Sequence, residues 1–397
     1  MSSPDLTNLE SDRVMEVLKT RYLSIGPRIK EFEKLIAKQC GRKFGVGVNS
    51  GTSGLHLCVI AAGISEGDLV ITSPFSFVAS ANCILYERGI PIFVDVDPET
   101  GNIDPTLVAE AVSDLSQNCK HAGSWLPPSY QSANGFGRLK SILPVHAFGQ
   151  PADMDPILVT AAEYDLVVIE DACEALGAEY KGRNAGALSD AAVFAFYPNK
   201  QISTGEGGMI VTDNEEWSIL FNSLRNQGRD VFDTWLYHTR LGYNYRLDEL
   251  SAALGLVQAQ RLDELLDKRS QVANWYNERL AEIELIECPH IIPDTTFMSW
   301  FVYVVRVKPP AVRNELITQL ADKGIPSRAY FTPIHLQPFY RETFGYGPGD
   351  FPIAEYLGSV SLALPFSSVM TENQVDYVCS VLKCLLKQSV SARVLEG

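Results

Sequence analysis

The sequence has few of the residues that mark disulfide-bonded, zinc-binding and membrane-spanning chains. Its eight cysteines are scattered without a C-x-x-C pair, and its six histidines are equally dispersed along the 397 residues. Isolated cysteines behave as small buried hydrophobes, so we expect neither a disulfide framework nor a metal site. No run approaches the roughly 18 consecutive apolar residues that a membrane helix needs, and we expect no membrane partner.

Positive charge is also scarce. The chain carries 33 Lys and Arg residues against 48 Asp and Glu residues, for a net charge of −15. Such a chain repels phosphate backbones, so we expect no nucleic-acid partner. Residues 1–10 are polar and acidic, without the apolar stretch of a secretory signal. Together with the scattered thiols, this favours a cytoplasmic location.

The composition is that of an ordered protein with a large core, and the length suits two domains. Short β-rich runs alternate with helical runs through the first two thirds, which predicts an α/β domain with a mostly parallel sheet. Strands are expected at 44–48, 68–72, 91–94, 143–146, 166–169, 191–196 and 208–212, and helices at 53–62, 79–87 and 104–113. We expect a large domain over residues 1–260 and a smaller α+β domain over 261–397.

Three segments shape this organisation. Residues 116–140 are rich in Ser, Gly, Asn and Pro and read as a long loop, a feature that is often functional. Residues 247–276 read as one long helical region that leads into the small domain. A strand at 301–307 and helices at 312–323 and 371–387 complete that domain, and the polar end at 388–397 is expected to fray.

The run Asn49-Ser50-Gly51-Thr52-Ser53-Gly54 stands between an expected strand and an expected helix. Small residues, hydroxyls and free N–H groups at a helix N-terminus bind phosphate, although a simple N-cap turn has the same composition. The preceding glycines lack the third glycine of the dinucleotide fingerprint, and no P-loop run exists. A nicotinamide-dependent oxidoreductase is therefore a weak alternative.

Two further candidates follow apolar strands. Asp171 lies where ligands bind in open α/β sheets, and its carboxylate could pair with a cationic ring nitrogen, although an N-cap aspartate is common there. Lys200 stands beside aromatic residues and before the glycines at 205, 207 and 208. Partial burial can make such a lysine nucleophilic, while an exposed loop lysine is the ordinary alternative.

The order of phosphate turn, aspartate, lysine and glycine cluster resembles the DegT/StrS family of nucleotide-sugar aminotransferases. The resemblance extends from about Leu23 to the last helix, and its matching stretches are 41–57, 72–97, 144–156, 169–180, 190–213, 242–261 and 333–340. It implies an enzyme that depends on pyridoxal 5'-phosphate. The implied fold is the aspartate-aminotransferase fold, type I, whose large domain has a sheet of the seven-stranded type.

The resemblance also implies roles for single residues. Lys200 would attach to the cofactor aldehyde, Asp171 would keep the pyridine nitrogen protonated, and Phe77 would stack on the ring. Phosphate contacts would come from Gly51, Thr52 and Ser53, and from Asn244 reaching into the neighbouring subunit of a homodimer with shared active sites. Glu174 would also contact the cofactor, and Tyr330 and His335 would approach the substrate; a packing role for His335 is an equal alternative.

The sequence departs from the family pattern in three places. Ala195 stands where a serine often adds a phosphate contact. Glu174 stands where a glutamine is frequent, and a glutamate there resembles the perosamine-synthase-like members. The 116–140 segment is longer than the family connection, and we hypothesise that it shapes the substrate entrance.

The resemblance implies a transamination in two halves. Glutamate is the expected amino donor, and a nucleotide-linked 4-keto-6-deoxyhexose is the expected acceptor, giving an amino sugar for surface polysaccharide or secondary metabolites. Two alternatives keep the fold: a sugar dehydratase, in which histidine replaces the lysine, and a non-catalytic regulatory protein. The sequence does not fix the sugar, the nucleotide or the aminated carbon.

Overall fold

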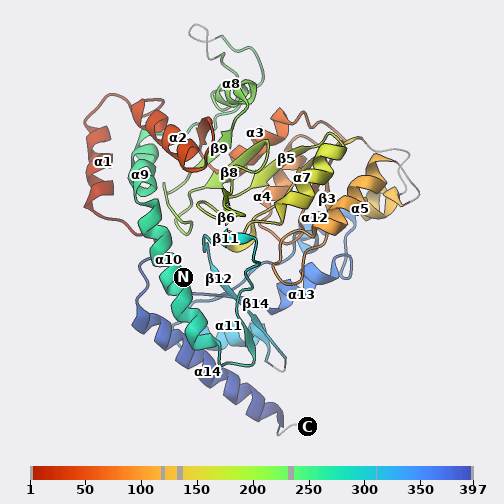
Figure 1. Cartoon of the computed structure of the whole chain (residues 1–397), viewed down its shortest axis with the longest axis vertical. Coiled ribbons are helices and arrows are strands. Elements are labelled where there is room, and N and C mark those ends of the chain that lie inside the picture. Colours follow the sequence, from red (N-terminus) through yellow and green to blue (C-terminus); the bar gives the residue numbers. More distant parts are fainter. Residues whose placement is uncertain (1–2, 118–120, 132–136, 231–236, 310, 395–397) are drawn as a thin grey trace.

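The computed structural model describes residues 3–117, 121–131, 137–230, 237–309 and 311–394. Its centre is a seven-stranded sheet in the order β1-β9-β8-β5-β4-β2-β3 (Figure 1). The strands are β1 (Phe44–Val48), β2 (Leu69–Thr72), β3 (Ile90–Phe93), β4 (Leu139–Leu143), β5 (Val167–Asp171), β8 (Ala191–Ala195) and β9 (Gly208–Thr212). β9 alone is antiparallel to its neighbours, which confirms the expected α/β fold with a mostly parallel sheet.

Helices cover both faces of this sheet, because its strands are apolar on both sides. In β2, Leu69 and Ile71 belong to one buried cluster, whereas Val70 belongs to another on the opposite face. One face carries α3 (Gly51–Ala61), α4 (Ala79–Tyr86) and α8 (Glu215–Leu224). The other carries α5 (Pro105–Ser116), α7 (Met154–Glu163), α2 (Pro27–Gln39) and α9 (Glu249–Gln260).

The helical region expected at 247–276 is divided in two. Helix α9 ends at Gln260, and α10 (Leu262–Leu280) begins after Arg261. The Arg261 guanidinium pairs with Asp5 at 2.8 Å and with Glu10 at 2.7 Å, which ties the N-terminal helix α1 (Asn8–Leu18) to this break. The division of the chain into residues 1–260 and 261–397 falls at the same place and stays a prediction.

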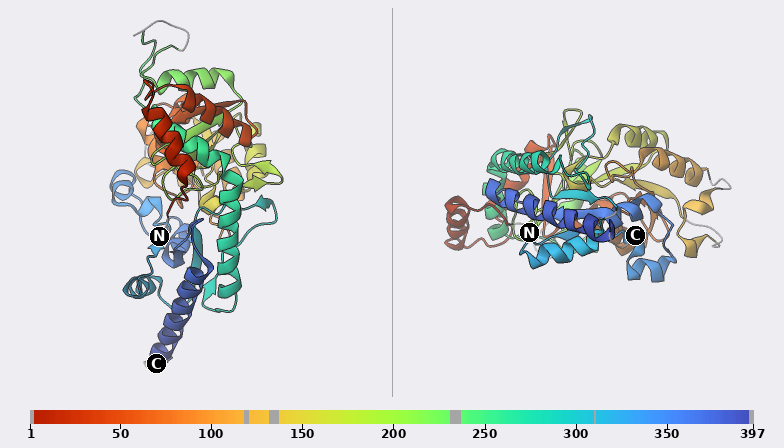
Figure 2. Two further views of the ribbon diagram at one scale, coloured as in Figure 1. Left: turned by 90° about the vertical axis from the view of Figure 1, so that its left-hand side faces the viewer. Right: turned by 90° about the horizontal axis from the view of Figure 1, so that it is seen from below.

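A second, antiparallel sheet follows α10 in the order β10-β12-β14-β13. Its strands are β10 (Ile286–Glu287), β12 (Tyr303–Val307), β13 (Arg328–Ala329) and β14 (Ser361–Leu364). Helices α11 (Arg313–Asp322) and α14 (Glu372–Val394) pack around it, and Figure 2 shows α14 beside α10 at one end of the molecule. Two short helices, α12 (Pro338–Phe344) and α13 (Pro352–Val360), lead from β13 back to β14.

A third small sheet joins distant parts of the chain. The hairpin of β6 (Glu179–Tyr180) and β7 (Arg183–Asn184) pairs with β11 (Thr295–Phe297), which lies beyond α10. The segment after β11 then continues to Phe301, beside the carboxyl ends of the central strands. This pairing brings residues near 300 to the site described below.

Three local expectations are wrong. The strand expected at 143–146 is β4, which ends at Leu143, because Pro144 has no N–H to continue the ladder. The expected loop 116–140 includes the short helices α6 (Ala122–Trp125) and η1 (Pro128–Tyr130) and the start of β4; residues 118–120 and 132–136 lie outside the described chain. The expected frayed end is helical up to Val394.

Two negative findings concern the described chain. It contains no helix with the length and apolarity to cross a membrane. Nor does it group three or more His, Cys, Asp or Glu residues where they could hold a metal ion.

Candidate active site

A cavity of about 480 Å³ lies at the carboxyl ends of the central parallel strands, within the usual size of a small-molecule site. Residues that follow five of these strands (β1, β2, β4, β5 and β8) line it, and one wall comes from Phe301, Tyr330 and Phe331. Seven of the ten predicted site residues meet here: Gly51, Thr52, Phe77, Asp171, Glu174, Lys200 and Tyr330. The other three, Ser53, Asn244 and His335, do not line the cavity.

The turn between β1 and α3 offers unpaired N–H donors to the cavity. Ser50 caps α3, and its Oγ accepts the Ser53 N–H at 3.1 Å. The N–H groups of Gly51 and Thr52 have no partner in the described chain, so they can donate to a phosphate. Ser53 turns away, and its hydroxyl donates to Asn49 Oδ1 at 2.7 Å.

Glycine at position 51 is required by close packing. A Cβ added there would stand 2.8 Å from both Ala195 Cβ and Cys173 Sγ. Such contacts are far inside van der Waals distance, so the turn sits tightly against the ends of β5 and β8. The absence of a side chain leaves the N–H groups of the turn open to the cavity.

Asp171 ends β5 with its carboxylate held by two donors. Ser80 in the first turn of α4 donates to Oδ2 at 2.8 Å, and the Cys173 N–H donates to Oδ1 at 3.2 Å. These two hydrogen bonds fix the orientation of the carboxylate. A carboxylate held in this way at the wall of a cavity can pair with a protonated ring nitrogen.

Lys200 lies in the loop after β8, where its own backbone N–H donates to Tyr197 O at 2.9 Å. Its amine Nζ lies 3.5 Å from Glu174 Oε1 and 3.8 Å from the centre of the Phe301 ring. The amine is therefore enclosed between a carboxylate and an aromatic face. It also lines the cavity that Asp171 and the α3 N-terminus line.

Glu174 is almost fully buried next to Lys200. Burial raises the pKa of its carboxyl group, while the positive charge of Lys200 and the N–H of Phe148, which donates to Oε2 at 2.9 Å, partly oppose that rise. In this structure the side chain accepts from the backbone and faces the lysine amine. It is placed to exchange a proton with that amine.

Phe77 projects into the open part of the cavity, with 63% of the residue exposed. An exposed aromatic face beside the phosphate turn can stack on a planar ring. The opposite wall holds Tyr330 and Phe331, whose ring centres are 4.8 Å apart.

Asn244 and His335 lie elsewhere. The Asn244 carbonyl accepts from Asn49 Nδ2 at 3.3 Å, so its segment borders the phosphate turn of its own chain. His335 is fully buried, with Nε2 3.0 Å from Glu355 Oε1 and its ring against Phe351. Burial lowers the pKa of His335, the Glu355 carboxylate opposes this, and the position supports the packing alternative.

Several contributors to the site were not found from the sequence. Phe301 stands in an apolar run that gives no sign of a functional role. Phe331 lies near the cavity because the chain after β13 returns to the large domain, which the sequence does not indicate. Ser80 follows Phe77 by one helical turn, a spacing that could have indicated it. None of the described residues between 116 and 140 lines the cavity, so their position does not support the proposed substrate entrance.

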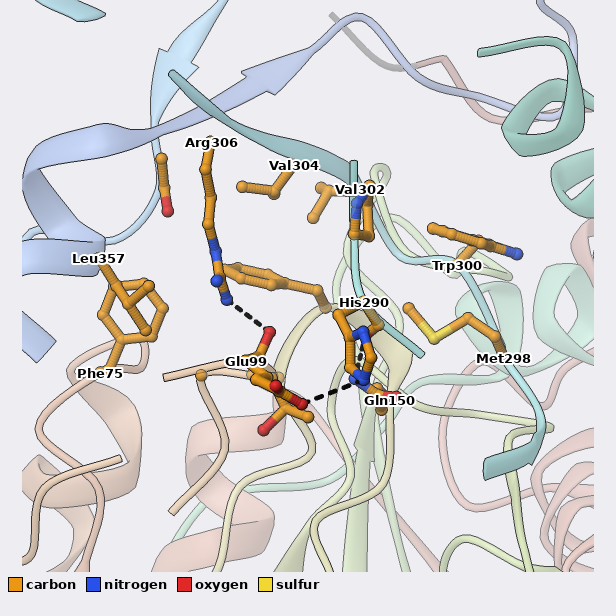
Figure 3. A pocket seen from close by; sticks show the side chains of 16 residues that line it. Phe75, Glu99, Gln150, His290, Met298, Trp300, Val302, Val304, Arg306 and Leu357 are labelled. Atoms are coloured by element: carbon orange, nitrogen blue, oxygen red, sulfur yellow. Dashed lines mark hydrogen bonds and ion pairs between the residues drawn. The ribbon is translucent and has the colours of Figure 1, made fainter. Parts of the chain in front are cut away.

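A second, smaller cavity lies beside β12 (Figure 3). Its charged side chains already have partners: Arg306 donates to the backbone carbonyl of Glu99 and pairs with Glu287 at 2.9 Å, and His290 Nε2 lies 3.2 Å from the Glu99 carboxylate. Neither a lysine nor a helix N-terminus lines it. The site residues predicted from the sequence line the 480 Å³ cavity and not this one.

The larger cavity fits a phosphorylated pyridine aldehyde. Free amides at the start of α3 suit the phosphate, and the Asp171 carboxylate suits a protonated ring nitrogen. The exposed face of Phe77 suits the ring, and the Lys200 amine suits the aldehyde. This set of four partners is what pyridoxal phosphate requires.

Comparison with known proteins agrees with this geometry. The model of the DegT/DnrJ/EryC1/StrS aminotransferase family matches residues 4–383. The chain is similar to GDP-perosamine synthase from Caulobacter vibrioides, with 37% identity over 390 residues, or 97% of this chain and 98% of that protein. Among solved structures it resembles DesV from S. venezuelae, with 31% identity, a TM-score of 0.83 and coverage of 94% and 93%. It also resembles the PLP-form of Spr1654 from Streptococcus pneumoniae, with 25% identity, a TM-score of 0.85 and coverage of 98% of each chain.

Proposed function

Because the chain belongs to the DegT/DnrJ/EryC1/StrS aminotransferase family, we propose that it transfers the amino group of glutamate to the ketone of a nucleotide-linked keto-sugar. The acceptor is a nucleotide-linked 4-keto-6-deoxyhexose. The observation that carries this proposal is the meeting of Lys200, Asp171 and the α3 N-terminus in one cavity. The product is an amino sugar, made in the cytoplasm for surface polysaccharide or secondary metabolites.

The chain is a pyridoxal-phosphate-dependent sugar aminotransferase. When bound, the cofactor supplies an electron sink that makes the α-proton of an attached amine acidic. Gly51 and Thr52 would hold its phosphate, Asp171 its ring nitrogen and Phe77 its ring face. Lys200 would hold its aldehyde carbon.

The protein's own chemistry is proton transfer at Lys200. Lys200 would be released from the cofactor when the amino donor binds, and in both half-reactions its free Nζ would move a proton at the reacting carbon as general base and general acid. The carboxylate of Glu174 at 3.5 Å is the nearest acidic group to Nζ and can share its proton. The Ser80 and Cys173 donors hold Asp171 in place throughout.

The sugar nucleotide is proposed from two features. A relative named GDP-perosamine synthase is 37% identical over nearly the whole chain. Glu174 stands where the perosamine-synthase-like members carry glutamate. Assays with purified nucleotide-linked keto-sugars would identify the sugar, the nucleotide and the ring carbon that receives the amine.

Charge in the cavity supports a shared site in a homodimer. Lys200 is the single cationic side chain among the described lining residues, against Asp171, Glu174 and Glu206. A cofactor phosphate, a nucleotide diphosphate and a dicarboxylate donor need further positive or polar partners. A second copy of the chain supplies these, and Asn244, on a segment bordering the phosphate turn, is the proposed contributor to the partner's site.

The test is visible absorbance of the chain with pyridoxal phosphate, before and after glutamate is added. We expect a band from the lysine-attached cofactor that fades with glutamate in the parent chain and in the surface control Lys181→Ala. Lys200→Ala should lack this band. A band indifferent to both Lys200 and glutamate would contradict the proposal and favour the regulatory alternative.

A dehydratase is separated by its products. The aminotransferase should release an amino sugar and 2-oxoglutarate in equal amounts, measured by mass spectrometry. A dehydratase would instead release a deoxygenated sugar that carries no amino group. Lys200 itself argues against that alternative, since the dehydratases of this family carry histidine at the position.

A further inference from the structure

The guanidinium of Arg269 in α10 is buried without an ion-pair partner in the described chain. The residue is 2% exposed, and burial lowers the pKa of its guanidinium to about 10. Its Nε has no hydrogen-bond partner, while its two terminal nitrogens donate only to backbone carbonyls. Taking a charge out of water is costly, so this arrangement needs a reason.

The carbonyls that Arg269 binds come from two separate segments. One nitrogen donates to Trp300 O at 3.1 Å and to Phe301 O at 3.2 Å. The other donates to Lys200 O at 2.6 Å and to Asn199 O at 3.3 Å. The guanidinium therefore fixes the backbone of Lys200 against the backbone of Phe301.

Neighbouring contacts strengthen this link. Gln201 Nε2 donates to Ser299 O at 2.8 Å and to Glu174 O at 2.6 Å, which ties both segments to the turn after β5. The Phe301 N–H donates to Phe148 O at 3.1 Å, and the Phe148 N–H donates to Glu174 Oε2. One hydrogen-bond network therefore positions both the Phe301 ring and the Glu174 carboxylate beside the lysine amine.

The result is a place for a free ammonium group. The Phe301 ring centre lies 3.8 Å from Lys200 Nζ, a distance typical of a cation–π contact, and Glu174 Oε1 lies 3.5 Å from it. An amine needs such a place whenever it is detached, because a mobile ammonium in the cavity would obstruct the incoming substrate. The titratable groups that line the cavity around the amine are Asp171, Cys173, Glu174, Tyr197, Glu206 and Tyr330.

Building on the proposed function, we propose that Phe301 and Glu174 form a holding site for the Lys200 ammonium during the part of each cycle in which the lysine is free. Arg269 is the positioning residue of this site. It acts through backbone carbonyls and touches neither substrate nor cofactor. The buried cation is kept because its flat fork of donors can bind four carbonyls of two segments at once.

The test measures how fast Lys200 is acetylated by acetic anhydride in the full, cofactor-free chain, with peptide mass spectrometry as the readout. Other lysines of the same molecule are the internal reference. Only the unprotonated amine reacts, so loss of the aromatic face should speed acetylation of Lys200 about fivefold. We expect this for Phe301→Met and for 3,5-difluorophenylalanine at position 301, and a rate within twofold of the parent for Phe301→Tyr.

Fluorination keeps the shape of the ring and weakens the negative charge of its face. It therefore distinguishes the electrostatic effect of the ring on Lys200 from its effect on the access of acetic anhydride. If Phe301→Met is faster while the fluorinated chain matches the parent, the effect is access alone and the proposal is overturned. Equal acetylation rates in the parent, in Phe301→Met and in the fluorinated chain would also overturn the proposal. Because acetylation needs neither cofactor nor substrate, these outcomes leave the proposed aminotransferase reaction untouched.

Arg269 is tested in the same assay by Arg269→Lys and Arg269→Gln, which keep donors but lose the fork. We expect Lys200 to be acetylated several-fold faster in either soluble variant. A parent-like rate beside a lowered melting temperature would make Arg269 a purely structural residue. If neither variant folds, Gln201→Leu, which loosens the same two segments, decides the point by the same comparison.

Discussion

Ser80 Oγ donates a 2.8 Å hydrogen bond to Asp171 Oδ2, which joins the first turn of α4 to the end of β5. This bond orients the carboxylate that faces the proposed ring nitrogen. A hydrogen bond to a charged acceptor contributes about 1.5–3 kcal/mol. Ser80→Ala should therefore slow the glutamate half-reaction by roughly tenfold to a hundredfold, measured by stopped-flow absorbance.

Ser76→Ala is the matched control for that substitution. Ser76 Oγ lies 2.8 Å from Ser80 Oγ and, among the described residues, has no hydrogen bond to Asp171. It should change the rate by less than about threefold. Equal losses in both variants would show that Ser80 has no special relation to the carboxylate.

Glu174→Gln should make the cofactor-free chain more stable at neutral and alkaline pH. Burial raises the pKa of Glu174, so the folded chain retains a proton that the unfolded chain releases above its ordinary value of 4.5. Stability then falls as pH rises from the unfolded to the folded pKa. We expect the melting temperature of the variant to exceed that of the parent by about 1–3 °C near pH 8 and to match it near pH 4.

Calorimetry across that range checks the sign, with Glu110→Gln on the exposed side of α5 as control. The control should show no pH-dependent difference from the parent. A lower melting temperature for Glu174→Gln near pH 8 would mean that the ionised pair with Lys200 stabilises the fold.

Glu10→Gln should weaken the attachment of α1 to Arg261 at neutral pH, where the carboxylate of the parent is ionised. Burial alone would raise the pKa of Glu10, but hydrogen bonds from Thr7, Arg261 and Gln258 outweigh it and lower the pKa to about 2. The stability from the ionised carboxylate is present above the unfolded value of 4.5 and is lost as pH falls from there to about 2. The variant should melt a few degrees lower at pH 7 and converge with the parent near pH 2.

Glu16→Gln changes an exposed carboxylate of the same helix and is the control. Limited proteolysis at pH 7 gives a second readout, because a loosened α1 exposes its junction with α2. Equal cleavage of both variants would contradict the anchoring role of Glu10.

Gly51→Ala should weaken cofactor binding. The added Cβ would meet Ala195 Cβ and Cys173 Sγ at 2.8 Å and push the turn away from the sheet. Overpacking of this kind costs about 1–3 kcal/mol, so the dissociation constant should rise at least about fivefold. Titration of the chain with pyridoxal phosphate measures it.

Gly123→Ala provides the comparison, because a Cβ at Gly123 meets nothing within 4 Å. It should leave cofactor affinity unchanged and the melting temperature at or above that of the parent. An unaltered affinity in Gly51→Ala would mean that the turn can move without loss of the phosphate contacts.

Local patterns were enough for much of the sheet. The strands at 44–48 and 208–212 were predicted to the residue, because apolar runs there are bounded by glycine and polar turns. The break at Arg261 could not be seen, since apolar spacing continues through Leu262 and the break is fixed by distant Asp5 and Glu10. Lys200 and Asp171 stood out by position and by family resemblance.

The surroundings of those two residues were hidden for a different reason. Phe301 and Arg269 have no local motif, and they meet Lys200 only because β11 pairs with β6 and brings the segment near 300 to the sheet. His335 carried a family expectation that its burial against Glu355 does not support. Long-range contacts, which a single sequence does not display, decide such cases.

The position of β1 at the sheet edge also determines when this strand can join the sheet during synthesis of the chain. Among the described strands β1 has β9 as its one neighbour in the sheet, joining Phe44–Val48 to Gly208–Thr212. The ribosome must therefore add roughly 160 residues after Val48, over about 8–30 seconds, before the edge strand has its neighbour. Until then β1 is not joined to β8 through β9, so we expect a nascent chain to complete the site for its vitamin-derived cofactor only after more than half of it has been translated.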